Sequence, residues 1–152
     1  MLKTCGFTGH RKIAEDKLEF VRRELCREIA VAVPNGFTHF ICGMCDGADL
    51  EFAEIIAKEK EGNPEISLEA AIPYRDRLKT KNSKFHELLE KCNKITFTGE
   101  DYNRNCYRVR NSYIVGKSDV IIAVFDGRNR SGTAQTIRIA QKENREIKLI
   151  GI

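Results

Sequence analysis

The chain has 152 residues, of which 41% are hydrophobic and 32% charged, and its formal net charge at pH 7 is +4. These values are typical of one globular domain, and so weak a positive charge does not by itself indicate a nucleic-acid-binding protein. No apolar run approaches the ~20 residues of a membrane span and the start of the chain lacks a signal-peptide pattern, so we expect a cytoplasmic protein without membrane contact.

The apolar residues predict strands and helices in alternation along the chain. The predicted strands cover residues 3–7, 38–42, 66–72, 94–98, 120–125 and 147–152. Helical periodicity begins between them at Glu15, near Ala48, around Phe85, near Asn105 and near Thr133. This order predicts a three-layer α/β/α sandwich with a mostly parallel sheet of about six strands. We expect a single domain over 1–152, because no repeat or linker interrupts the alternation.

The six cysteines are expected to be free thiols. Cys5 and Cys42 end apolar runs, while Cys26 and Cys92 occupy apolar positions of helical patterns, and such cysteines behave as small buried hydrophobes. Cys42 and Cys45 have the CxxC spacing of zinc and redox sites, but no second ligand pair accompanies them. We therefore predict no metal, with metal or redox use as the less favoured alternative.

Three predicted strands end in a glycine-bearing loop that leads into a helix, within residues 4–11, 41–49 and 124–133. In a parallel sheet such loops meet at the carboxyl edge of the strands, where ligands bind. A helix that begins at a glycine-rich loop also presents free N–H groups and its positive dipole end to an anion. The sequence therefore predicts a site for a phosphate-bearing ligand at this edge.

The first loop carries three polar side chains suited to such a ligand. The Thr8 hydroxyl can donate to a phosphate, and Arg11 can pair with it through two parallel hydrogen bonds. His10, with an ordinary pKa near 6.5, is a candidate acid or base. Spacing identifies no partner carboxylate for it, so a single hydrogen bond or a helix cap is the alternative.

The other two loops leave several interpretations open. Asp49 opens a helix, where an acid stabilises the positive dipole end, or it accepts from a ribose hydroxyl. Asp46 is predicted to be a cap or turn residue. Thr133 is placed to cap the last helix and to donate to a phosphate.

Residues 75–84 form the densest basic stretch of the chain. We expect a solvated surface. The alternative is a strip that follows the phosphates of single-stranded nucleic acid, with Tyr74 and Phe85 as the few stacking residues around it.

Several segments together carry a family resemblance. They are residues 5–11 (CGFTGHR), 43–49 (GMCDGAD), Cys106 with 110–115 (RNSYIV), 118–119 (SD), 126–127 (DG) and 131–136 (SGTAQT). In this set the chain resembles the SLOG superfamily of Rossmann-like proteins, and within it the YpsA-like group of uncharacterised bacterial proteins. The candidate ligand-binding residues are Gly6, Thr8, Gly9, His10, Arg11, Gly43, Met44, Gly47, Asp49, Arg110, Asn111, Asp126, Gly127, Ser131, Gly132 and Thr133.

The resemblance implies a Rossmann-like fold that binds a nucleotide or a nucleotide derivative. Relatives in the superfamily include DNA-processing proteins that hold single strands, phosphoribohydrolases, and sensors of nucleotide signals. The phosphoribohydrolases carry a catalytic glutamate three residues after the threonine of the last loop, where this chain has Thr136.

We therefore expect binding of a nucleotide-derived ligand such as an ADP-ribose-like molecule, with no other cofactor. A hydrolase using Asp49, Asp126 or Glu100 is an alternative, as is single-stranded DNA binding, and no catalytic set is identified. A homodimer is a further expectation.

Overall fold

The computed structural model describes residues 3–152 as one six-stranded sheet with helices packed against it. The strands are β1 (Lys3–Gly9), β2 (Phe37–Cys42), β3 (Ser67–Ile72), β4 (Lys94–Phe97), β5 (Val120–Phe125) and β6 (Glu146–Gly151). Every neighbouring pair is parallel, in the order β4-β3-β2-β1-β5-β6. The predicted α/β fold with a parallel sheet is confirmed.

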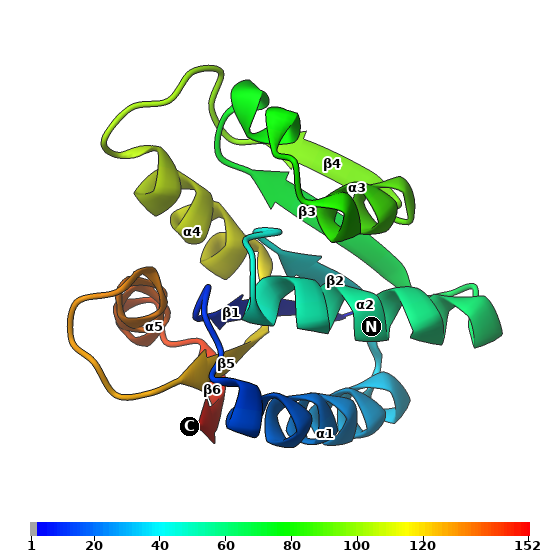
Figure 1. Ribbon diagram of the computed structural model, residues 1–152. Helices are drawn as coiled ribbons and strands as arrows, with labels where there is room; N and C mark the ends of the chain where they lie inside the picture. Colours follow the sequence, from blue (N-terminus) through cyan, green and yellow to red (C-terminus); the bar gives the residue numbers. More distant parts are fainter. Residues whose placement is uncertain (1–2) are drawn as a thin grey trace.

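Helices cover both faces of the sheet (Figure 1). One face carries α1 (Glu15–Ala32), α2 (Ala48–Gly62) and α3 (Ser83–Glu90), and the other carries α4 (Cys106–Lys117) and α5 (Gly132–Lys142). The larger core lies under the first set, where the Phe7 and Phe52 rings stack with centroids 4.6 Å apart. A smaller core around Ile41, Ile114 and Ile121 lies under α4 and α5.

Helix α1 follows its predicted apolar stripe, because the buried positions recur at three- and four-residue steps. They are Val21, Leu25, Ile29 and Ala32. The helix ends in the short 3-10 turn η1 (Val33–Asn35), which Gly36 closes in the left-handed conformation. Cys26 corrects one expectation: it is exposed. It follows Leu25 by one residue, which is about 100° around the helix, so it lies off the buried stripe.

The first strand is longer than predicted and runs through Gly9 instead of ending at Phe7. Thr8 and Gly9 pair with Ala123 and Val124 of β5, which keeps the backbone extended to the edge of the sheet. A second unpredicted element is the 3-10 helix η2 (Arg75–Lys79), inside the basic stretch. Among the described residues, no helix combines the length and apolar character needed to cross a membrane.

The connections leave a topological switch point between β1 and β5. From β1 the chain adds β2, β3 and β4 on one side, then crosses over to place β5 on the other side of β1 (Figure 1). The loops after β1 and β5 therefore lead away from each other, and a crevice opens between them. Ligands of open α/β sheets bind at such crevices.

Candidate functional site

A cleft of about 450 Å³ opens at this carboxyl edge. The three glycine loops and helix α4 supply its walls. Its lining residues are Phe7, Thr8, Gly9, His10, Arg11, Lys12, Gly43, Cys45, Asp49, Tyr107, Arg110, Asn111, Ile114, Arg128, Arg130, Ser131, Gly132 and Thr133. The fold thus brings most of the sequence-predicted residues into one cleft.

Five predicted residues stand outside the lining. Gly6 packs beneath the end of α4, where a Cβ would clash with the Ser118 hydroxyl, and the Met44 side chain is buried in the larger core. Gly47 adopts φ +81°, and a Cβ there would clash with the backbone carbonyl of Arg11. It therefore lets the second loop pack directly against the first. The remaining two, Asp126 and Gly127, begin the loop after β5.

Arg110 is the structural centre of the cleft floor. The residue is only 4% exposed, and its guanidinium donates to the carbonyl oxygens of Gly43 (2.9 Å) and Ala71 (3.2 Å). It also donates to Asn111 Oδ1 (3.0 Å) and Cys45 Sγ (3.5 Å). Gly43 has to lack a side chain, because a Cβ would overlap this guanidinium. Arg110 thereby ties α4 to the ends of β2 and β3.

Asp49 is the buried acid of the cleft, 5% exposed in the first turn of α2. Its Oδ2 accepts from the backbone N–H of Cys45 (3.0 Å), which fixes the second loop. Burial raises the pKa of Asp49 to about 6, although Arg110 and Arg11 act in the opposite direction. A carboxylate held in this way can still accept a hydrogen bond from a ligand hydroxyl in the cleft.

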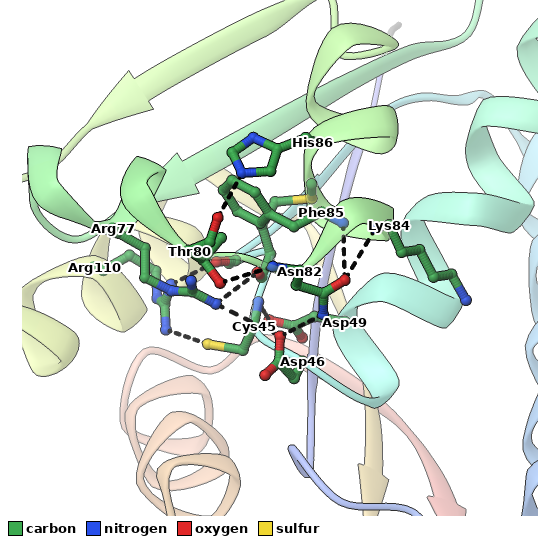
Figure 2. Close-up of polar contacts among 12 residues, drawn as sticks. Cys45, Asp46, Asp49, Arg77, Thr80, Asn82, Lys84, Phe85, His86 and Arg110 are labelled. Carbon is green, nitrogen blue, oxygen red and sulfur yellow. Dashed lines mark hydrogen bonds and ion pairs between the residues drawn. The ribbon is translucent and has the colours of Figure 1, made fainter.

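The second loop is also held from the side of the basic stretch (Figure 2). Arg77 Nη2 lies 3.8 Å from Asp46 Oδ1 and donates to the Met44 carbonyl at 3.5 Å. Asn82 donates to the same Asp46 oxygen (2.9 Å), while its own Oδ1 caps α3. Of the two roles predicted for Asp46, cap or turn residue, the structure has the second: Asp46 lies in the turn before α2, and Gly47 occupies the N-cap position. Its carboxylate also anchors the neighbouring segment.

The solvated surface expected for residues 75–84 is found at Arg75, Lys79 and Lys81, which are exposed, but not at Arg77. Arg77 is 14% exposed by its side chain and its guanidinium lies over the Phe85 ring, so it is not solvated surface. Arg75 pairs with Glu100, and Lys84 pairs with Glu51 and Glu54. Much of the positive charge of this stretch is neutralised by carboxylates. This neutralisation weakens the alternative interpretation, in which the stretch follows the phosphates of a nucleic acid.

The first and third loops are joined through His10, which is 6% exposed. His10 Nε2 lies 3.0 Å from Asp126 Oδ1 and 3.1 Å from the backbone nitrogen of Asp126. Its Nδ1 lies 3.5 Å from Thr133 Oγ1. Burial lowers the pKa of His10 despite the opposing effect of Asp126. Spacing alone could not identify this carboxylate, because 116 residues separate the pair.

Helix α5 begins at this wall of the cleft, with Ser131 as its N-cap. Ser131 Oγ accepts from the backbone N–H of Ala134 at 3.0 Å. The cap is thus Ser131 and not Thr133, because the N-cap residue precedes the first helical turn and its side chain can turn back onto that turn. Thr133 lies within the turn, and Gly132 beside it has open space where a Cβ would be.

Sequence reasoning missed four residues that add charge and an aromatic ring to the cleft. They are Lys12, Tyr107, Arg128 and Arg130. The guanidinium of Arg11 lies 4.9 Å from the Tyr107 ring centroid and that of Arg110 lies 5.3 Å from it. Two signals were available in the sequence: the two arginines lie inside the third loop, and Tyr107 precedes Arg110 by one helical turn.

The structure places all six cysteines in the described part of the chain, and none of them forms a disulfide. All six are free, and burial raises the pKa of Cys42 well above its ordinary value. Cys45 Sγ accepts from Arg110 at the cleft floor. Within residues 3–152, no three His, Cys, Asp or Glu side chains gather as potential metal ligands.

Known proteins share both the sequence pattern and the fold. The chain matches the YspA SLOG family (YpsA) over residues 8–152. It is 22% identical to the UPF0398 protein of Halalkalibacterium halodurans over 135 residues, which is 85% of this chain and 71% of that protein.

Two solved structures show the same fold at low identity. DNA processing protein A from Helicobacter pylori, described with a single-stranded DNA binding mode, has a TM-score of 0.68 and 19% identity. The match covers 97% of this chain and 64% of that one, so this chain spans less than two thirds of its length. The molybdenum cofactor carrier protein from Chlamydomonas reinhardtii has a TM-score of 0.64 and 20% identity over 98% of this chain and 76% of that one.

The family match covers nearly the whole chain, including the second and third glycine loops and the first from Thr8 onward. It confirms the resemblance inferred from the loop motifs. The chain belongs to the YspA SLOG family (YpsA).

Proposed function

We propose that the cleft binds a nucleotide or nucleotide-derived ligand, such as an ADP-ribose-like molecule. The observation that carries this proposal is the meeting of three glycine loops around one cleft at the β1–β5 switch point. Nucleotide phosphates bind at such crevices, against the N-terminus of a helix that follows a glycine-rich loop. Helix α5 begins at Gly132 in this position, with Ser131 as its N-cap.

The charges of the lining residues favour an anionic ligand. Arg11, Lys12, Arg128 and Arg130 face the cleft from the first and third loops and are exposed. Arg110 contributes its charge from below, but its N–H groups already donate to protein atoms. We therefore assign direct phosphate contact to Arg11, Lys12 and Arg130, and a positioning role to Arg110. Arg128 already donates two hydrogen bonds to Asp126, so it adds positive charge without an assigned phosphate contact.

Asp49 provides the cleft with a hydrogen-bond acceptor, which would bind a part of the proposed ligand other than its phosphates. A carboxylate in a Rossmann-like crevice accepts from a ribose hydroxyl. Asp49 lines the cleft and is held by the N–H of Cys45, so its remaining acceptor positions are oriented. A ligand with both phosphate and ribose would satisfy the cationic loops and this acid together.

A thermal-shift panel of nucleotides, dinucleotides and ADP-ribose tests the proposal. A ligand at about 100 times its Kd stabilises a protein by roughly 2.7 kcal/mol, or about 5–10 °C in Tm at this size. We expect Gly132→Trp to abolish that shift, because the indole would fill the cleft beside α5.

Gly116→Trp is the matched control. Gly116 is also a helical glycine with open space at its Cβ, but it lies outside the cleft lining and should preserve the shift. A well-folded protein that no compound in the panel stabilises would contradict the proposal.

Native mass spectrometry of the same sample tests the expected homodimer.

Single-stranded DNA is a second candidate ligand, favoured by a tyrosine cluster beside the cleft. Tyr74 packs edge-on against Tyr102 and Tyr107, with ring centroids 5.5 and 6.2 Å away. Tyr102 is 65% exposed and offers a face to an unpaired base. Bases stack on such rings with little sequence preference.

Tyr102→Ala separates the two candidates. For an oligonucleotide, loss of one stacked base costs about 1–3 kcal/mol, so affinity should fall roughly 5–150-fold. Tyr102 does not line the cleft, so mononucleotide binding should stay unchanged. Fluorescence anisotropy with a labelled oligonucleotide measures the first quantity. Unchanged oligonucleotide affinity, or binding insensitive to salt, would count against this candidate.

A further inference from the structure

Three polar side chains form a continuous chain in the wall of the cleft. Asp126 comes from the loop after β5, His10 from the end of β1, and Thr133 from the first turn of α5. Asp126 Oδ1 lies 3.0 Å from His10 Nε2, and His10 Nδ1 lies 3.5 Å from Thr133 Oγ1. His10 and Thr133 are both cleft-lining, at 6% and 3% exposed. The order is acid, imidazole, hydroxyl.

Which ring nitrogen of His10 carries the proton decides whether His10 can accept a proton from the Thr133 hydroxyl. If Nε2 carries it, Nε2–H lies 3.0 Å from the Asp126 carboxylate oxygen and the Nδ1 lone pair faces the Thr133 hydroxyl, but the backbone N–H of Asp126 loses Nε2 as its acceptor. If Nδ1 carries it, the Nε2 lone pair accepts from the backbone N–H of Asp126 but faces a carboxylate oxygen at 3.0 Å. Hydrogen bonds to Asp126 from Arg128 keep that carboxylate ionised, with a pKa of about 2. Attraction between Nε2–H and this ionised carboxylate favours the first tautomer, at the cost of the backbone hydrogen bond from Asp126.

Neither of the other candidate acids is arranged beside a base. Asp49 accepts from the Cys45 N–H and lies near Arg110, and Glu100 is 71% exposed by its side chain and pairs with Arg75. Glu100 is also outside the cleft lining. A nucleophile within reach of a base, with the base oriented by a third group, is the arrangement that nucleophilic catalysis needs, and the contact is often longer without substrate.

We propose that Thr133, His10 and Asp126 form a catalytic centre that cleaves a phosphoric anhydride bond of a nucleotide-type ligand. Thr133 is the nucleophile, His10 the general base, and Asp126 the positioning residue that selects the tautomer. The inference rests on the proposed function, because the cleft has to hold the ligand first. It adds an activity to that binding site.

The reaction balances in two steps. Thr133 Oγ1 bonds to phosphorus as its proton moves to His10 Nδ1, and the bond from phosphorus to the bridging oxygen breaks, its electron pair leaving with the departing phosphate. That phosphate, or solvent, takes the proton from His10. Water then gives a proton to Nδ1 and bonds to phosphorus, while the bond to Oγ1 breaks and Oγ1 recovers a proton from His10. The N-terminus of α5 and Arg130 stabilise the negative oxygens.

The test incubates the full chain with ADP-ribose, NAD and ADP, and follows anhydride cleavage by chromatography. We expect turnover, and a phosphorus-bearing adduct on Thr133 after acid quenching, identified by peptide mass spectrometry. Thr133→Val and His10→Gln should each lower the rate by about 10²–10⁴-fold. Asp126→Asn should lower the rate and move the acidic limb of its pH profile to lower pH, because Asp126 raises the pKa of His10.

Two matched variants control for folding. Thr136 lies one turn further along α5 and donates to the Gly132 carbonyl, and His86 lies on α3 outside the cleft. Thr136→Val and His86→Gln should keep the wild-type rate. Thermal shift on the same samples reports binding. A compound that stabilises the protein but is not cleaved would overturn this inference alone, as would cleavage unchanged by Thr133→Val. Absence of both binding and cleavage would overturn the proposed function with it.

Discussion

Arg110→Met is expected to lower the free energy of unfolding by about 3–5 kcal/mol, the usual cost of removing one partner from a buried charged network. Methionine retains much of the volume but donates no hydrogen bond. The carbonyl oxygens of Gly43 and Ala71 would lose this donor, and Ala71 is fully buried. Asp49 would also lose the neighbouring cation that opposes the effect of burial, so its pKa would rise further above about 6.

Urea denaturation at pH 7 measures this loss, with Arg108→Met as the matched control. Arg108 is on the same helix and exposed, so its replacement should change stability by no more than about 0.5 kcal/mol. The double variant with Asp49→Asn should recover part of the loss, because the neutral amide at this position no longer needs the cation. If Arg110→Met and Arg108→Met lower the free energy of unfolding equally, the Arg110 guanidinium is not the link between α4 and the strand ends.

The fold was predictable because its signals are local. The apolar stripe of α1 and the fully apolar β5 can each be recognised within a short segment of sequence. The strict alternation of strands and helices then predicts a parallel sheet. The glycine loops followed from the same reasoning, since parallel strands bring their carboxyl ends to one edge. The element boundaries that differed, such as the extension of β1 to Gly9, depend on pairing with β5.

The contacts inside the cleft depend on distances along the chain that spacing does not encode. His10 meets Asp126 across 116 residues, and Arg110 reaches Gly43 across 67. Arg110 was predicted beside Asn111 as a candidate, but its burial could not be read from a helix whose neighbours are polar. The contacts of Asp46 were missed for a similar reason, because its partners come from the segment after β3.

One buried acid could have been noticed from the sequence. Glu69 interrupts the apolar strand β3 and is 2% exposed. It accepts from His39 (2.7 Å), Thr96 (2.6 Å) and Tyr113 (2.6 Å), which joins β2, β4 and α4. Burial alone would raise the pKa of Glu69, but these hydrogen bonds outweigh it and lower the pKa to about 2.

Glu69→Gln is therefore expected to cost about 2–3 kcal/mol at pH 7. The amide is uncharged, and its NH₂ group would face groups that now donate to the carboxylate. Because the folded pKa lies below the ordinary 4.5, the carboxylate contributes stability above pH 4.5, and this is lost as pH falls from 4.5 towards 2. The difference between wild type and variant should consequently narrow over that range.

Urea denaturation at pH 7, 5 and 3.5 measures this difference, with Glu65→Gln as the exposed control on the same approach to β3. The control should stay within about 0.5 kcal/mol of wild type at pH 7. If the difference in unfolding free energy between wild type and Glu69→Gln is constant from pH 7 to 3.5, the Glu69 side chain stabilises the fold through its shape and not its charge. If this difference narrows as pH falls, the Glu69 carboxylate is the charged group that holds α4 against β2 and β4. Because α4 supplies the floor of the cleft, the same carboxylate then also fixes the position of that floor.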